Sequence, residues 1–354
     1  MRELIGQVSE NLKKTDFDTL WKGFHRYPFA LYDEKKVYLE NGEILRDERF
    51  FGNTAIEYEG GKLAIWNIEG EPAKEDAETL TADMVHEMFH AFQYEKGEKR
   101  FPNDLKTLLY PSDIENFNLK YIENKLLADA FETTDLPYKR QLLNQICGLR
   151  QKRRELIGEM IECEYFSETF EGMAEYIGTS ALKILSDEKY TQRCKIYIRK
   201  LRDLSALQFD IRRISYYSGA VLLLTVKELG IDFHHDISGA KQPVWGWIAD
   251  TLSPELPKLT EADIELEKAL IKTRYEHESE IEEFIHSFES VMDGDFLITG
   301  YDPMNMIRVR DYILCKTFVR LTDNKSNTAE SLMGQTLLEM VPDSENRVKR
   351  FFRK

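Results

Sequence analysis

The chain has 354 residues, of which 42% are hydrophobic and 12% aromatic, so a disordered protein is excluded and a folded globular protein is expected. Its formal net charge of −15 argues against nonspecific binding to nucleic acid or to an anionic membrane, because both require a positive protein surface. A chain of this length is long for a single domain. We therefore expect one elaborated domain or two to three subdomains, with neither a nucleic-acid nor a membrane partner.

The N-terminal residues and the cysteines bear on the cellular compartment. The stretch MRELIGQVSENLKK has scattered charges and no apolar run, so it does not have the pattern of a secretory signal. No segment approaches the roughly 18–20 uncharged apolar residues that a membrane-spanning helix needs. Four cysteines are widely spaced without a CxxC pair. The simplest interpretation is reduced thiols in a cytoplasmic protein, although two disulfides also fit the count.

Residues 53–69, NTAIEYEGGKLAIWNIE, predict a β-hairpin. Gly60 and Gly61 lie between two alternating runs, and two glycines suit a two-residue turn that needs positive φ. Pairing outward from these glycines sets Glu59 opposite Lys62. Opposite charges would then meet at the turn, with apolar side chains sharing one face of the hairpin.

The remaining pattern predicts an α+β protein that is mostly helical, in three parts. The expected parts are a β-containing segment at residues 1–75, a helical region at 76–230 with an insertion at about 100–160, and a C-terminal helical and β subdomain at 231–354. In the last part, a charged helix to about residue 290 precedes two or three strands rich in β-branched and aromatic residues. The basic patch at residues 150–154 is interpreted as a solvated helix face, since acidic residues follow it at once.

Residues 84–93 read MVHEMFHAFQ and contain an HExxH pattern. They predict one helix that ends at Gly97, a suitable C-terminal cap. Positions i and i+4 share a helix face, so His86 and His90 can direct ring nitrogens at one metal ion. Glu87, rotated by about 100 degrees round the helix, can reach a water on that metal and take its proton. The alternative is two ordinary helix histidines paired with nearby acids.

A zinc site requires a third protein ligand, and the next histidine, His234, lies far along the chain. The segment CEYFSETFEGMAEYIG, from residue 163, places four glutamates on one helical face: Glu164, Glu168, Glu171 and Glu175. Glu171 is selected because small residues beside it, among them Gly172, allow another helix to approach closely. Glu175 lies one turn further on, where it can accept the second N–H of a ligand histidine. The alternative is a solvated acidic stripe.

HEMFH followed downstream by FEGMAEY resembles the gluzincin group of zinc metallopeptidases, in which HExxH supplies two zinc ligands and a glutamate on a following helix supplies the third. The E-G-x-A form is similar to the aminopeptidase N and glycyl aminopeptidase branches. The stretch SYYSGA at residues 215–220 is similar to their Y-x-x-G element, whose tyrosine helps to stabilise an oxyanion. By position this implies Tyr216, with Tyr217 as its substitute, whereas core packing is the alternative for both. The resemblance is confined to short motifs within residues 84–220.

The resemblance implies a zincin-like catalytic domain with one zinc ion per chain, held by His86, His90 and Glu171. Glu87 would be the general base and Tyr216 the oxyanion donor. The long spacing between the histidines and Glu171 predicts a helical insertion between the metal-binding helices.

The resemblance also departs from the aminopeptidase N pattern. The glycine-rich GxMEN-type strand of that branch is absent. Its counterpart by position is the hairpin strand that contains Ala64 and Trp66. We interpret this strand as an edge that pairs with an extended peptide.

These patterns predict a cytoplasmic zinc metallopeptidase that acts on a peptide or protein substrate. One alternative is a noncatalytic binding or regulatory protein that keeps the fold. Glu87 argues against it, because a structural metal site needs no general base. A zinc hydrolase of a non-peptide substrate is a second alternative. The run His234-His235-Asp236 is interpreted as loop residues and not as a second metal site.

Overall fold

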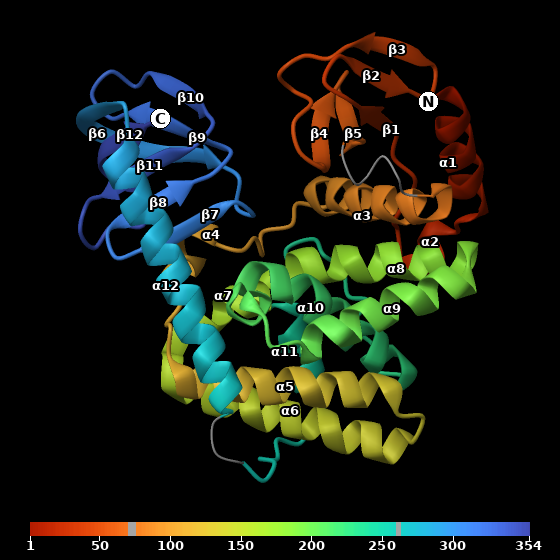
Figure 1. Ribbon diagram of the computed structural model, residues 1–354. Coiled ribbons are helices and arrows are strands. Elements are labelled where there is room, and N and C mark those ends of the chain that lie inside the picture. The colour runs from red at the N-terminus through yellow and green to blue at the C-terminus, as the bar shows by residue number, and fades with distance from the viewer. Residues whose placement is uncertain (70–75, 260–262) are drawn as a thin grey trace.

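The computed structural model describes residues 1–69, 76–259 and 263–354. About 51% of the chain is helical and about 19% lies in strands, which confirms the mostly helical α+β class. Figure 1 shows an N-terminal sheet, layers of helices beneath it, and a second sheet on the same side of the helices. Within these described ranges, no helix is both long and apolar enough to cross a membrane.

The N-terminal part combines two helices with a mixed five-stranded sheet of order β3-β2-β1-β5-β4. Its elements are α1 (Arg2–Lys14), α2 (Phe17–Leu20), β1 (Phe29–Tyr32), β2 (Lys36–Leu39), β3 (Gly42–Leu45), β4 (Thr54–Tyr58) and β5 (Gly61–Asn67). β5 pairs in parallel with β1 and antiparallel with β4. The strand with Ala64 and Trp66 is therefore interior, and the prediction of an edge strand there is wrong. The sequence of the hairpin could not show that β1 covers its second side.

The predicted hairpin forms, but in another register. Glu57, and not Glu59, lies opposite Lys62 and forms an ion pair with it at 2.5 Å. The two turn residues are Glu59 and Gly60, with φ of 49° and 81°. A type I′ turn requires positive φ at both central positions, and Glu59 adopts it in place of Gly61, which begins β5.

The helical part runs from α3 to α11. Its elements are α3 (Ala77–Glu95), α4 (Asp104–Thr107), α5 (Ile114–Glu132), α6 (Leu136–Ile157), the 3₁₀ turn η2 (Gly158–Ile161), α7 (Glu162–Ser167), the π-turn η3 (Glu168–Gly172), α8 (Met173–Leu185), α9 (Asp187–Arg202), the 3₁₀ turn η4 (Ala206–Phe209), α10 (Ile211–Glu228) and α11 (Val244–Ala249). α3 ends as predicted, with Gly97 at φ 73°. α4, α5 and α6 lie between α3 and η3, in the range where a helical insertion is predicted.

The π-turn η3 interrupts the long helical segment expected after residue 150. A π-turn fits an additional residue into one turn, so the side chains that follow it are rotated relative to those before it. Glu168 begins η3 and Glu171 lies near its end. Glu164 and Glu168 contact arginines, whereas Glu171 and Glu175 contact the histidines of α3. All four side chains are buried or nearly so, which rules out a solvated acidic stripe.

The first two glutamates belong to a buried ion-pair network, and the basic patch supplies two of its three cations. This ion-pair network consists of Lys120, Glu123, Arg150, Arg153, Glu164 and Glu168. Arg150 and Arg153 are 1% and 0% exposed, so the prediction of a solvated helix face is wrong for them. Arg150 donates to Glu168 at 2.8 Å, and Arg153 donates to Glu123 at 2.7 Å. Three cations face three carboxylates, so the ion-pair network is neutral.

The C-terminal part is a seven-stranded sheet with a long helix beside it (Figure 1). Its elements are α12 (Ile264–Ser287), β6 (Ser290–Tyr301), β7 (Met306–Val309), β8 (Tyr312–Cys315), β9 (Phe318–Asp323), β10 (Ala329–Met333), β11 (Thr336–Met340) and β12 (Arg347–Arg353). Neighbouring strands are antiparallel, in the order β10-β9-β6-β12-β11-β8-β7. Seven strands form here, so the expected two or three strands are too few.

The boundary expected at residue 231 lies too early. Phe233, Val244 and Ile248 pack in the same core as α3, α8 and α10. The C-terminal part proper begins with α12. Conversely, Leu105 of α4 belongs to the helical part by position but packs in the core of the C-terminal sheet. α4 therefore connects the helical part to this sheet.

We expect Gly178→Ala to destabilise the protein by about 1–3 kcal/mol, because a Cβ atom there would meet α3. It would lie 2.6 Å from the carbonyl oxygen of Ala82 and 3.3 Å from the Cβ atom of His86. Urea unfolding measures the change. The matched control is Gly6→Ala on α1, where nothing lies within 4 Å. That change should stabilise the protein by about 0.5–1 kcal/mol through helix propensity. Equal stabilities of Gly178→Ala and wild type would contradict the close approach.

Candidate metal centre

α3 and the η3–α8 segment bring together the three predicted ligands, His86, His90 and Glu171, which we call the ligand cluster. The Nε2 atoms of His86 and His90 are 3.1 Å apart. The Oε2 atom of Glu171 lies 3.2 Å from Nε2 of His90 and 3.8 Å from Nε2 of His86. Ligand atoms placed about 2.0–2.2 Å from a tetrahedral zinc ion are about 3.3–3.6 Å from one another. The ligand cluster therefore has the spacing that a zinc ion requires.

Hydrogen bonds on the far side of each ring orient the two histidines. Nδ1 of His86 donates to Oε2 of Glu175 at 2.8 Å, as predicted, and Nδ1 of His90 donates to Oε1 of Gln93 at 2.7 Å. Gln93 in turn donates to the carbonyl oxygen of Phe170 in η3 at 3.2 Å. With both Nδ1 atoms protonated, both Nε2 atoms keep a lone pair for a metal. Gln93 was not predicted, although its i+3 spacing from His90 is a sequence signal.

The electrostatics of the ligand cluster favour a bound cation. Burial opposes ionisation of Glu171 and Glu175, but their partners outweigh it. Arg212 and the histidines hold the pKa of Glu171 well below its usual value, and His86 lowers the pKa of Glu175 to about 2. Burial lowers the pKa of His86, yet its hydrogen bonds to both glutamates raise it well above the ordinary value. The site thus stabilises positive charge between these side chains, either a proton or a metal ion.

Glu87 lies beside the ligand cluster with an unpaired oxygen. The residue is 5% exposed, and its Oε2 atom has no hydrogen-bond partner among the described residues. Burial raises its pKa, while His86 and His90 lower it in part. One potential ligand atom from each of these three residues lies within 4.8 Å of the others. A buried carboxylate oxygen without a partner fits a residue that acts on a water in the site.

A cavity of about 600 Å³ lies over the ligand cluster. The N-terminal part contributes residues 51–54 and Trp66 to its lining. The C-terminal sheet contributes residues 301–305 and Phe318. The ring centroids of Phe51 and Phe318 are 4.9 Å apart, so the loop before β4 touches the C-terminal sheet beside the cavity. This contribution of the C-terminal part was not predicted.

The two adjacent tyrosines of α10 point to different places. Tyr216 lines the cavity, and its ring lies parallel to that of His86 at 6.0 Å. Burial and the Glu171 carboxylate raise the pKa of Tyr216 well above its usual value, so its hydroxyl keeps the proton and can donate it. Tyr217 instead accepts a hydrogen bond from Lys200 at 3.0 Å and is not part of the described cavity lining. Of the two tyrosines, Tyr216 therefore lies at the site and Tyr217 does not.

The two residues of β5 that were predicted to contact substrate also lie in different surroundings. Ala64 is fully buried in the core beneath the sheet and is not in the described cavity lining, so its predicted contact with substrate is wrong. Trp66 lines the cavity, and its indole N–H is buried without a hydrogen-bond partner among the described residues. Trp66 therefore remains a candidate to contact a ligand.

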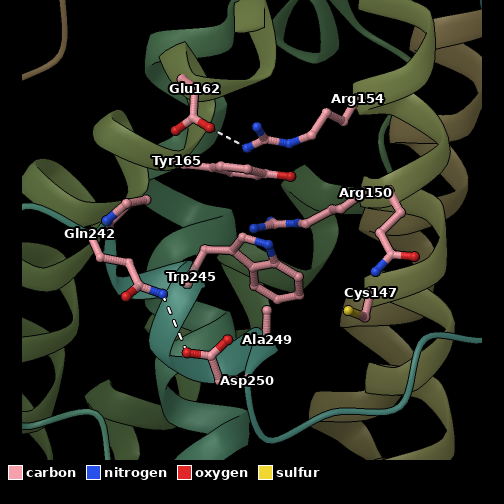
Figure 2. A pocket seen from close by; sticks show the side chains of 12 residues that line it. Cys147, Arg150, Arg154, Glu162, Tyr165, Gln242, Trp245, Ala249 and Asp250 are labelled. Carbon is pink, nitrogen blue, oxygen red and sulfur yellow. Dashed lines mark hydrogen bonds and ion pairs between the residues drawn. The ribbon is translucent and has the colours of Figure 1, made fainter. Parts of the chain in front are cut away.

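A second cavity, of about 280 Å³, lies beside the ion-pair network. Figure 2 shows Arg150 between the rings of Tyr165 and Trp245, with Arg154 on the other face of Tyr165. The guanidinium carbon of Arg150 is 5.2 Å from the centroid of Tyr165 and 4.2 Å from that of Trp245. The charge of Arg150 is already balanced within the ion-pair network. We therefore assign this stack to packing.

The rings of His234 and His235 do not point toward a common position. The ring of His234 packs on Trp21 at 4.8 Å, whereas that of His235 packs on Trp247 at 4.4 Å. This arrangement agrees with the interpretation as loop residues.

No protein-family model, curated protein or solved structure matches this chain. The case for a metal centre accordingly depends on the geometry of the ligand cluster and its neighbours.

Protein purified without added metal should contain about one zinc ion per chain, and Glu171→Ala should lose most of it, because two ligands hold zinc far more weakly than three. Metal content by mass spectrometry tests this. Glu159→Ala, in the exposed turn η2, is the control and should retain wild-type zinc. Wild-type protein that binds no zinc, even when zinc is supplied, would contradict the metal centre. Equal zinc in wild type and Glu171→Ala would exclude Glu171 as a ligand.

Proposed function

We propose that the protein is a zinc metallopeptidase of the gluzincin type with a zincin-like catalytic domain. The observation that carries this proposal is the convergence of two Nε2 atoms and one Glu171 oxygen at zinc-like spacing, with the unpaired oxygen of Glu87 beside them. The four cysteines are free and buried, which supports the proposed cytoplasmic location.

In the proposed mechanism, each side chain of the site has one chemical role. A zinc ion held by the ligand cluster would supply Lewis acidity toward a water and the scissile carbonyl. Glu87 takes the proton from the attacking water and gives it to the leaving amine. Tyr216 donates its hydroxyl proton in a hydrogen bond to the oxyanion that forms on the attacked carbonyl. Glu175 and Gln93 hold the histidine rings in place throughout.

The fold around the ligand cluster supports a peptide as substrate. β4 is the outer strand of its sheet, and Thr54 at its start lines the cavity. Extended peptides add to outer strands through backbone hydrogen bonds. The strand proposed to bind substrate is therefore β4, in place of the interior strand β5. The HExxH helix α3 packs against this sheet, as the zincin proposal requires.

Glu87→Gln should lower kcat for hydrolysis of a peptide library by about 10²–10⁴-fold while zinc content stays at the wild-type level. The amide keeps the size of the side chain but cannot accept the proton of the water. Product mapping by mass spectrometry identifies the bonds cleaved. Unchanged cleavage in Glu87→Gln would exclude this base. Zinc binding without any peptide cleavage by wild type would favour a noncatalytic protein or a non-peptide substrate.

Tyr216→Phe should lower kcat by about 10²–10³-fold with little change in KM, because the lost hydrogen bond forms chiefly in the transition state. Tyr217→Phe removes the same hydroxyl from the next residue, outside the cavity, and should keep wild-type kcat. Steady-state kinetics on one cleaved peptide compares the two variants. Equal losses in both, or no loss in Tyr216→Phe, would contradict the assigned role.

A further inference from the structure

Arg212 lies on α10 one turn before Tyr216, at the edge of the cavity. Its Nη2 atom donates to Oε1 of Glu171 at 2.5 Å, and its Nη1 atom donates to Oδ1 of Asp104. The three side chains are 12%, 4% and 15% exposed, in the order Arg212, Glu171, Asp104. One guanidinium therefore bridges two largely buried carboxylates.

The bridge uses the Glu171 oxygen that faces away from the histidines. Oε2 points at the two Nε2 atoms, whereas Oε1 is held by Arg212. Glutamate has a flexible side chain whose terminal torsion is broad. A planar guanidinium with fixed donor directions restricts that torsion strongly, especially with little water present. Arg212 thus holds Glu171 in the orientation that directs Oε2 at a metal.

The other end of the bridge is fixed to the C-terminal sheet through α4. Asp104 is the first residue of this four-residue helix. The next residue, Leu105, is 6% exposed and packs in the core of the C-terminal sheet. The preceding residue, Asn103, donates to Glu345 of the C-terminal part at 2.9 Å. The residues on both sides of Asp104 therefore contact the C-terminal part.

We propose that Arg212 is a positioning residue that holds Glu171 for the metal and, through Asp104, links this ligand to the C-terminal sheet. The metal centre is then complete only when the sheet is docked on α4. This inference rests on the proposed zinc site. It goes further in assigning the C-terminal sheet a part in metal binding.

Zinc affinity, measured by competition with a chromophoric chelator, tests the bridge in the full chain. Arg212→Ala should weaken zinc binding by about 10–100-fold, the usual effect of losing a group that orients a ligand. Arg212→Lys and Asp104→Asn should give smaller losses, since each keeps part of the bridge. With Co²⁺ in place of zinc, the visible absorption bands should shift in Arg212→Ala because the Glu171 geometry changes.

Arg202→Ala is the matched control. Arg202 also bridges two carboxylates, Asp129 and Glu132, each at 2.6 Å, but on the surface away from the ligand cluster. Zinc affinity and the Co²⁺ spectrum should stay at wild-type values in this variant. Unchanged zinc affinity and spectrum in Arg212→Ala would overturn the inference and leave the proposed function intact. If Arg212→Ala does not fold, the result for Arg212→Lys and Asp104→Asn decides in its place. Wild-type protein without zinc affinity would remove the proposed function itself.

The link to the sheet has a separate test. Leu105→Ala and Leu332→Ala each shorten a leucine in the core of the C-terminal sheet, where the two are 6% and 2% exposed. Both should lower stability by comparable amounts in urea unfolding. A several-fold weaker zinc affinity is expected for Leu105→Ala alone, because this change loosens α4. Equal zinc affinities in the two variants would overturn the link to the sheet.

Discussion

The fold depends on how four buried glutamates between residues 164 and 175 find positive partners. A carboxylate removed from water is several kcal/mol less stable unless a cation or strong donors accompany it. Glu164 and Glu168 satisfy this requirement in the neutral ion-pair network. Glu171, near the end of the π-turn, and Glu175, after it, face two histidines and one end of Arg212. Histidine is neutral or positive according to what it binds, so the second pair of glutamates creates a place for a cation.

Close helix approach sets the distances within the ligand cluster. A Cβ atom on Gly172 would lie 2.7 Å from the Cα atom of Gly219, so α10 can reach η3 at this point only because both residues are glycine. Gly178 has the same effect where α8 crosses α3 next to His86. The Glu171 oxygen lies 3.2–3.8 Å from the histidine nitrogens of α3, and these distances need close helix approach, since longer side chains between the backbones would hold the atoms further apart. The small residues after Glu171 thus have a geometric role that sequence reasoning could identify.

What the sequence predicted is mostly what short-range geometry determines. His86 and His90 share a face because a helix repeats every 3.6 residues, and the i+4 step from Glu171 placed Glu175 correctly. The arginines of residues 150–154 show the limit. Their spacing fits a buried face as well as a solvated one, and their partners lie on other elements. Arg212 is a similar case, because its partners Asp104 and Glu171 lie 108 and 41 residues before it in the chain. The hairpin register depends on which two residues adopt positive φ in the turn. The sequence did not show that these are Glu59 and Gly60 and not the two glycines.

The shape of the site bears on whether a metal there is structural or catalytic. Structural zinc sites are closed by four protein ligands, whereas catalytic sites keep one position open. Among the described side chains, the ligand cluster supplies three atoms at zinc-like spacing, and a cavity of about 600 Å³ adjoins them. Residues of both sheets and of α10 line this cavity. A protein that needed zinc only to hold helices together would gain nothing from the open position or from the unpaired Glu87 oxygen, and the buried carboxylate would destabilise it. The arrangement therefore favours the proposed catalytic site over a purely structural one.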